Sequence, residues 1–299
     1  MSLKIIGPDE RLARAGNATI AVFGPSGVGK THLARSLDPA TTLVMDAESG
    51  LLALGNWRGD SIDLRKIAGD LGLHPWELCR GIASLLSGPD FSDYEIGPLG
   101  RIAGPYSPEM HAQYVKTLGT FADLFGKYRT VFFDSITVAS RWSFAWSSSQ
   151  PESLSDKGKK DTRGTYGLHG QQMIRWLTQL QHANLNIVVV GILDRVEDDM
   201  HRVSWQPQIE GGKAGRELPG IFDNVLTLGR FARDADGKML FDPKEGTERA
   251  LVCDMMNPWG LPAKDRSGTL GILEPPDLGR LLAKIEAARA AAPTIPSAA

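Results

Sequence analysis

Four short apolar runs divide the first two thirds of the chain, and each of them ends at glycine or polar residues. They are residues 18–23, 42–45, 130–133 and 186–193. Runs that are apolar without alternation are typical of strands buried on both faces of a parallel sheet. We therefore expect an α/β fold of three layers, in which binding chemistry collects at the carboxyl ends of the strands.

Helices are predicted between these runs, because apolar residues recur there every three or four positions. The predicted helices lie around residues 75–87, 108–125 and 168–182. Residues 30–37 carry helix-compatible residues after a glycine-rich turn that follows the first run, and residues 277–292 predict an Ala/Leu-rich terminal helix. Strands that alternate with helices indicate a mostly parallel sheet.

The carboxyl-terminal third has a different pattern. Residues 225–228 and 250–253 are apolar and are separated by turn-rich sequence, which predicts a β-meander that completes the sheet. Residues 143–165 and 194–219 are polar and rich in Gly, Lys and Ser, and we expect them to be long loops, the first one mobile.

The domain organisation follows from these patterns. We expect an amino-terminal extension over residues 1–16, a single domain of this α/β kind over 17–292 and a disordered tail over 293–299. The sequence contains no internal repeat.

Composition narrows the class of protein. Of the 299 residues, 33 are Lys or Arg and 35 are Asp or Glu, so any nucleic-acid surface must be local. Cys79 and Cys253 have no metal-binding or disulfide-framework spacing. Residues 1–16 lack the apolar core of a signal peptide, and no apolar stretch reaches transmembrane length. We expect a cytoplasmic protein without a membrane partner.

A glycine-rich segment after the first apolar run carries the clearest chemistry. Its pattern, Gly-x₄-Gly-Lys-Thr between a predicted strand and a predicted helix, is that of a phosphate-binding P-loop. The glycines let backbone N–H groups surround the phosphates, Lys30 reaches the β and γ phosphates, and Thr31 ligates Mg²⁺. The sequence therefore predicts binding of ATP with Mg²⁺. The predicted nucleotide-binding residues are Gly24, Pro25, Ser26, Gly27, Val28, Gly29, Lys30, Thr31 and His32.

Two acids at the ends of later runs are candidate partners of the P-loop. Asp134 closes a buried run and is placed to hold Mg²⁺, or else caps a helix or turn. Glu48 follows the run directly after the P-loop helix, where its carboxylate can orient or deprotonate the attacking water. By alternation, Asp46 is expected on the opposite face. From position alone, Glu48 can equally be a solvated acid.

The Asp46-Ala47-Glu48 ending resembles the equivalent strand of RecA-type recombinases, which implies that Glu48 activates the water. The Lys264-x-Arg266 element looks like that of the RadA and DnaB branches of the same superfamily. That resemblance implies that Lys264 and Arg266 are catalytic residues acting in the ATP site of a neighbouring subunit, and hence a homo-oligomer. A solvated basic turn is the alternative.

Across residues 17–285 the order of elements resembles a family of phage-encoded RecA-like ATP-binding proteins, some of which are single-strand annealing recombinases. The phrase at residues 218–225, Leu-Pro-Gly-Ile-Phe-Asp-Asn-Val, contributes to the resemblance. One departure is that the run ending at Asp194 lacks the Gln or His with which relatives sense the γ-phosphate. Asp194 or Arg195 is the expected substitute.

The resemblance also implies that two segments, residues 140–166 and 194–218, line a channel for single-stranded DNA. Trp142, Phe144 and Trp146 can stack on bases, or they can pack beneath the first segment as core. The candidate DNA-binding residues are basic and neutralise phosphates; they are Arg141, Lys157, Lys159, Lys160, Arg163, Arg202, Lys213 and Arg216.

The leading hypothesis is an oligomeric RecA-like P-loop ATPase that acts on single-stranded DNA in phage recombination or replication, with DNA-stimulated hydrolysis of ATP to ADP and phosphate. A hexameric helicase or translocase is the second hypothesis. A nucleotide-gated binding module with little turnover is the third.

Overall fold

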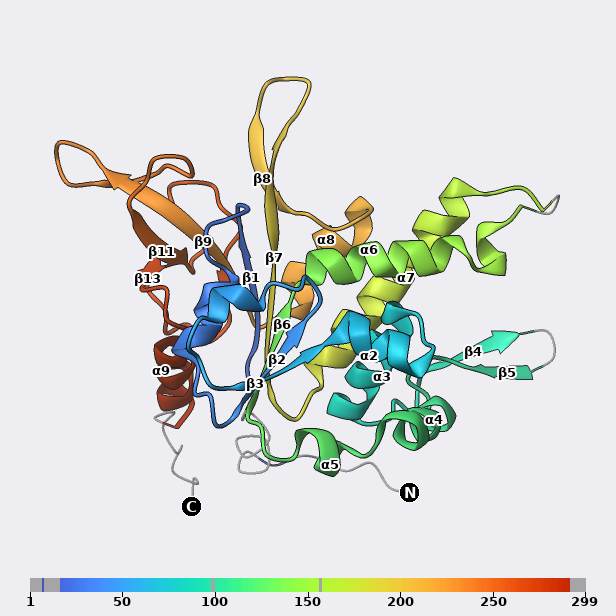
Figure 1. The fold of residues 1–299 in the computed structure, drawn as a ribbon. Coiled ribbons are helices and arrows are strands. Elements are labelled where there is room, and N and C mark those ends of the chain that lie inside the picture. Colours follow the sequence, from blue (N-terminus) through green and yellow to red (C-terminus); the bar gives the residue numbers. More distant parts are fainter. Residues whose placement is uncertain (1–6, 8–16, 98–99, 156–157, 291–299) are drawn as a thin grey trace, which may run out of the picture.

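The computed structural model describes residue 7 and residues 17–97, 100–155 and 158–290. Apart from residue 7, the expected amino-terminal extension lies outside the described residues, as does the expected tail at 293–299. The fold is α/β, as the alternating pattern predicts (Figure 1).

The described residues form one large sheet and one small hairpin. The strands of the large sheet are β1 (Thr19–Gly24), β2 (Thr42–Asp46), β3 (Asp60–Asp63), β6 (Thr130–Asp134), β7 (Asn186–Glu197), β8 (Val203–Pro207), β9 (Asn224–Arg233), β10 (Met239–Phe241), β11 (Glu248–Val252), β12 (Lys264–Asp265) and β13 (Leu273–Glu274). The small hairpin joins β4 (Tyr94–Gly97) to β5 (Gly100–Ala103).

The order across the large sheet is β13-β11-β9-β1-β7-β6-β2-β3. Every pair from β9 through to β3 is parallel, whereas β10, β11 and β12 pair with β9 in the antiparallel sense. The carboxyl ends of β1, β2 and β6 therefore meet at one edge of the sheet. The antiparallel additions confirm the predicted carboxyl-terminal meander, and β9 also continues the parallel sheet.

Helices cover both faces of the sheet (Figure 1). The α-helices are α2 (Leu64–Leu71), α3 (Pro75–Ser87), α4 (Pro108–Leu118), α5 (Phe121–Phe125), α6 (Ile136–Ser148), α7 (Thr162–Gln181), α8 (Gly212–Ile221) and α9 (Leu278–Ala290). The 3-10 helices are η1 (Thr31–Ser36), η2 (Leu51–Leu54) and η3 (Pro151–Ser153). The helix after the P-loop is thus of the 3-10 type. The helix expected around residues 108–125 is divided at Gly119, whose φ of 111° is unfavourable for other residues.

The side chains of β1 point alternately to the two faces of the sheet, and this explains the three layers. Ala21 and Phe23 belong to a cluster on the face covered by α3 and α7, whereas Ile20 and Val22 belong to a second cluster on the face covered by η1 and α9. All four side chains are fully buried. A strand apolar on both faces is what the unalternated sequence run predicts.

The two segments expected to be long loops are more ordered than predicted. Residues 143–165 begin inside α6 and end inside α7, and residues 194–219 form a hairpin of β7 with β8 followed by most of α8. The prediction treated serine as a sign of exposure. Ser143 is buried, however, because its hydroxyl lies 3.0 Å from Nδ1 of His169 on α7, and a hydrogen-bonded hydroxyl packs inside a protein at little cost.

Among the described residues, no helix is long and apolar enough to span a membrane.

Candidate nucleotide-binding site

The P-loop connects the carboxyl end of β1 to η1, as predicted. Gly27 and Gly29 have φ values of 75° and 100°, a region that residues with a side chain rarely adopt. At Gly24, a Cβ atom would lie 2.5 Å from the backbone oxygen of Leu228 and 2.9 Å from Val28. The glycines are therefore required by the path of the loop itself.

Lys30 folds back onto this loop. Its ammonium group donates hydrogen bonds to the backbone oxygens of Gly24 and Pro25, each at 3.0 Å. Burial lowers the pKa of Lys30, while the negative charges of Glu48 and Asp134 oppose that shift. The ammonium thus lies at the pocket, where a phosphate group can replace the two carbonyl oxygens as its partner.

The side chains of Thr31 and Asp134 meet, although β1, which precedes Thr31, and β6, which ends at Asp134, are not adjacent. β7 lies between β1 and β6, yet Oγ1 of Thr31 donates a hydrogen bond of 2.5 Å to Oδ2 of Asp134. Burial, with the charges of Glu48 and Asp46, raises the pKa of Asp134 to about 6, and the hydrogen bond from Thr31 lowers it only in part. A hydroxyl and a buried carboxylate, whose charged form is disfavoured by burial, are suitable ligands for Mg²⁺, because Mg²⁺ commonly takes one or two carboxylates together with substrate phosphates.

Glu48 lies in the turn after β2, not at the end of the strand. Asp46 supports the turn: its Oδ1 accepts hydrogen bonds from the backbone N–H groups of Glu48 at 2.9 Å and Gly50 at 3.2 Å. Asp46 is buried. The hydroxyl of Ser135, directly after Asp134, donates a hydrogen bond to the Glu48 carboxylate. Sequence reasoning assigned no role to Ser135, which follows a candidate ligand in the chain and is thus carried to the same edge of the sheet.

Lys30, Thr31, Glu48 and Asp134 line one pocket of about 280 Å³. A Cβ added at Gly50 would lie 3.9–4.0 Å from Asp134, Glu48 and Thr31, so the three side chains converge there. The residues around the pocket are Ser26, Gly27, Gly29, Lys30, Thr31, His32, Glu48, Ala53, Asp134 and Ile192.

The expected substitutes for a γ-phosphate sensor are placed differently. β7 continues through Asp194 and Arg195 into the hairpin with β8. The guanidinium of Arg195 pairs with Glu197 at 3.0 Å, and neither Asp194 nor Arg195 lines the pocket in the described structure.

Lys264 and Arg266 lie at the opposite end of the sheet. The Lys264 ammonium donates to the backbone oxygens of Pro219 at 2.5 Å and Phe222 at 2.8 Å, at the carboxyl end of α8. Arg266 pairs with Asp223 at 2.9 Å, and Asp223 in turn binds Thr19 at the start of β1. β1 has six residues, and the five steps from Thr19 to Gly24 span about 16 Å at ~3.3 Å per step, so neither side chain is placed at the P-loop of its own chain.

The predicted DNA-binding residues are divided between two regions. Lys159, Lys160 and Arg163 are exposed and lie in the connection between η3 and α7 or on the first turn of α7. Lys157 lies outside the described residues. Arg141 is exposed on α6 and binds Gln208 at 3.2 Å.

The remaining candidates lie in or after the β7–β8 hairpin, which projects from the top of the sheet (Figure 1). Residues 194–207 carry four acidic side chains and only two arginines, of which Arg202 is the exposed candidate. Arg216 is exposed on α8 and bonds to the backbone oxygen of Gly212 at 3.0 Å. Lys213 lies on α8, outside the described side chains. The hairpin is therefore not a basic surface.

Two of the three aromatic residues in the first segment pack against the core. Trp142 and Trp146 are partly buried against the main cluster, and the guanidinium of Arg80 lies 4.3 Å from the ring centre of Trp146. The Phe144 ring lies 4.9 Å from that of Tyr166. The packing alternative is confirmed for Trp142 and Trp146. For Phe144, which pairs with the partly exposed Tyr166, base stacking stays a prediction.

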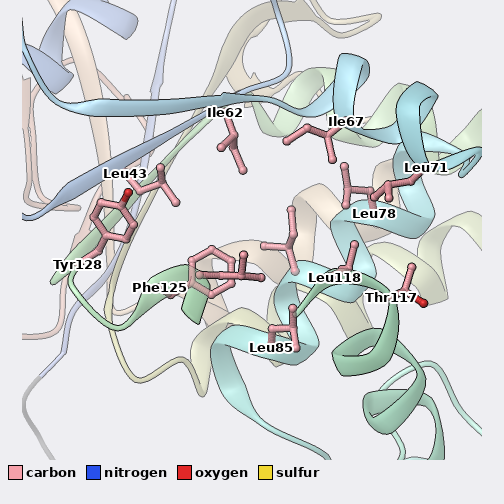
Figure 2. Close-up of a pocket in the computed structure, with 12 residues that line it drawn as sticks. Leu43, Ile62, Ile67, Leu71, Leu78, Leu85, Thr117, Leu118, Phe125 and Tyr128 are labelled. Carbon is pink, nitrogen blue, oxygen red and sulfur yellow. The ribbon is translucent and has the colours of Figure 1, made fainter. Parts of the chain in front are cut away.

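A second pocket, of about 240 Å³, lies between β3, α2, α3 and α5 (Figure 2). Ile62, Leu78, Leu118 and Phe125 point into it. Its lining is almost entirely aliphatic and aromatic, so it offers no group for phosphate or metal chemistry.

A mostly parallel sheet with a P-loop after β1, a Thr31–Asp134 contact and a held glutamate defines a P-loop nucleotide-binding ATPase. The family model described as "AAA domain" matches residues 16–267, so the chain belongs to that family. The family includes ATPases that bind ATP with Mg²⁺, in agreement with the donors in this pocket. None of the curated proteins with which the chain was compared matches it.

Proposed function

We propose that this protein hydrolyses ATP by a RecA-like mechanism, as an oligomer that acts on single-stranded DNA. The observation that carries the proposal is the Glu48 carboxylate, which the Ser135 hydroxyl holds at the pocket that contains Lys30, Thr31 and Asp134. A P-loop alone supports only the binding of ATP. An oriented carboxylate beside it supports hydrolysis as well.

Each side chain has a separate task in this proposal. Glu48 orients the attacking water and accepts its proton, and the Ser135 hydrogen bond keeps the carboxylate in place. Lys30 exchanges its two carbonyl partners for oxygens of the β and γ phosphates, where its charge stabilises the transition state. Thr31 and Asp134 hold Mg²⁺, which neutralises charge on the phosphates when it is bound.

The oligomer is supported by the position of Lys264 and Arg266. Both lie at the amino end of β1, too far from the P-loop of their own chain, so a role at an ATP site requires the site of another subunit. An arginine supplied from a neighbour couples hydrolysis to assembly.

The proposed DNA surface is best supported around the start of α7. Three exposed cations lie there, Lys159 and Lys160 before the helix and Arg163 in its first turn. The segment 155–166 contains four basic and two acidic residues. The β7–β8 hairpin is net acidic and is not part of the proposed surface. The resemblance to phage RecA-like proteins supports a place in recombination or replication.

ATP turnover with and without single-stranded DNA tests the proposal. We expect Mg²⁺-dependent hydrolysis that rises when single-stranded DNA is added, and binding of that DNA that weakens steeply with salt. Unchanged turnover together with no DNA binding at low salt would refute the DNA part. Nucleotide binding without turnover would identify a nucleotide-gated binding module, and strand unwinding would identify a helicase.

A further inference from the structure

Arg249 lies on β11, a strand whose direction brings it to the P-loop. β11 runs antiparallel to β9, and Leu251 pairs with Leu228, the residue whose backbone oxygen lies closest to Gly24. Leu251 and Leu228 belong to the cluster on the η1 face of the sheet. Since alternate residues of a strand share a face, Arg249 points to that face, two residues closer to the nucleotide edge.

The guanidinium of Arg249 reaches the loop itself. A Cβ atom built on Gly29 would lie 2.4 Å from Nη1 of Arg249, so only a glycine leaves room for this approach. The same Cβ position would lie 3.8 Å from the Cβ atom of His32. The guanidinium therefore lies beside Gly29 and His32.

Among the residues that the structure describes, no acid pairs with the guanidinium of Arg249, and the guanidinium donates no hydrogen bond; the neighbouring acid, Glu248, pairs with Arg233. The residue opposite it on β9 is Arg230. Like charges directly opposite one another in a sheet are destabilising. An anion bound at the loop would relieve this repulsion.

The position along the P-loop indicates which part of the ligand is contacted. Glu48 and Asp134 mark the end of the pocket where the γ-phosphate reacts, beside Lys30 and Thr31. Arg249 approaches from the β9–β11 side of the loop, at Gly29 and His32. We propose that Arg249 is a nucleotide-binding residue that donates hydrogen bonds to the phosphate chain of a nucleoside di- or triphosphate bound by its own subunit, at the nucleoside end of that chain.

This inference rests on the proposed ATP binding and adds a cation in cis that is distinct from Lys264 and Arg266. It predicts that Arg249 contributes equally to ADP and ATP, because both nucleotides carry the α and β phosphates. A residue that contacts the γ-phosphate would instead contribute to the affinity for ATP but not to the affinity for ADP.

The test is the affinity of the full chain for ADP and for ATP with Mg²⁺, measured by titration calorimetry. Arg249→Gln should weaken both nucleotides by a similar factor of about ten or more, because a charge-assisted hydrogen bond is lost. Arg249→Lys should retain most of the affinity. Arg35→Gln is the matched control, since it removes a positive charge near His32 from an exposed arginine that bonds to Asn56 instead.

Wild-type affinity for both nucleotides in Arg249→Gln would overturn the inference, and so would an equal loss in Arg35→Gln. A loss confined to ATP would also overturn it. If the wild type binds neither nucleotide, the proposed function fails instead. Thermal unfolding without nucleotide shows that each variant is folded.

Discussion

The hydroxyl of Ser135 donates a hydrogen bond to the carboxylate of Glu48, across the ends of two neighbouring strands. β2 and β6 are in register there, with Asp46 opposite Asp134, and the backbone N–H of Ala47 donates to the oxygen of Asp134 at 2.6 Å. The backbone thus fixes the ends of the two strands relative to one another, and the turn that carries Glu48 begins at a defined position beside Ser135.

Replacing Glu48 by glutamine should leave ATP bound and abolish most of the turnover. The amide keeps the size of the side chain but cannot accept the proton of the attacking water, and positioned general bases contribute roughly 10²–10⁴-fold. Titration with ATP should give an affinity close to that of the wild type, while steady-state hydrolysis falls by about that factor. Turnover near the wild-type value would remove Glu48 from the mechanism.

Ser135→Ala should lower turnover less severely, by about tenfold, because Glu48 remains but is no longer held. Ser135 also caps α6 by accepting a hydrogen bond from the N–H of Val138 at 3.5 Å, and loss of a cap costs about 1 kcal/mol. Ser107→Ala is the matched control: Ser107 is a buried serine that caps α4 through Met110 at 3.3 Å, away from the pocket.

Both serine variants should lower the unfolding temperature by similar amounts, and only Ser135→Ala should slow hydrolysis. Equal turnover in the two variants would show that the Ser135 hydroxyl acts on stability alone.

Asp265 should make the stability of the protein sensitive to acid. Partial burial acts to raise the pKa of its carboxyl, but hydrogen bonds from Ser267, Leu270 and Asn224 outweigh burial and hold the pKa below its usual value. A depressed pKa contributes stability that is present above the unfolded value, about 3.9, and is lost as the pH falls through the folded value.

Asp265→Asn keeps the size of the side chain but removes the charge that these donors favour. We expect it to lower the free energy of unfolding by about 1–3 kcal/mol at neutral pH. The difference from the wild type should begin to narrow below about pH 4, where the unfolded carboxyl takes up a proton, and should go on narrowing until the folded carboxyl is protonated as well. Urea unfolding at several pH values measures this, and a difference independent of pH would contradict the assignment.

The parts of the fold predicted from sequence are those whose signal is local. Continuous apolar runs identified β1, β2, β6 and β7, and apolar spacing predicted the helix that the structure shows as α3, Pro75–Ser87. The strand β3 was missed because its sequence, Asp-Ser-Ile-Asp, is polar: it is an edge strand with one neighbour. Alternation or apolar content cannot identify such a strand.

The candidate site was predicted where a motif is contiguous and missed where the contact depends on register. The P-loop residues are adjacent in the chain, and Asp134 follows a buried run. Arg249 lies 220 residues after Gly29 and meets it only because β11 is antiparallel to β9. Similarly, polarity alone did not indicate that Ser143 is buried against α7.

The basic residues at the start of α7 should account for much of the salt dependence of DNA binding. Replacing Lys159, Lys160 and Arg163 by alanine should reduce the slope of log affinity against log salt by about 2, since each phosphate contact to a single strand contributes roughly 0.7. Fluorescence anisotropy with a labelled oligothymidine over a range of salt measures the slope.

A control for that triple variant removes the same charge elsewhere. Lys238, Lys244 and Arg280 are exposed and lie on the β9–β11 connections and α9. Their replacement by alanine should leave the slope unchanged. Equal slopes in the two triple variants would show that the α7 cations do not bind DNA.

Arg266 tests whether the ATP site is shared between subunits. In its own chain it pairs with Asp223 at 2.9 Å, so Arg266→Ala can lose activity through a weaker contact with α8 or through an incomplete neighbouring site. Mixing Arg266→Ala with a second variant, Lys30→Ala, distinguishes these two causes of lost activity. When inactive Arg266→Ala and Lys30→Ala chains assemble at random in equal amounts, roughly a quarter of the interfaces join an intact Lys30 to an intact Arg266. Hydrolysis should therefore recover to about that fraction of the wild-type rate in the mixture. A rate equal to the average of the two separate variants would mean that Arg266 acts only within its own subunit, through Asp223 and the end of α8.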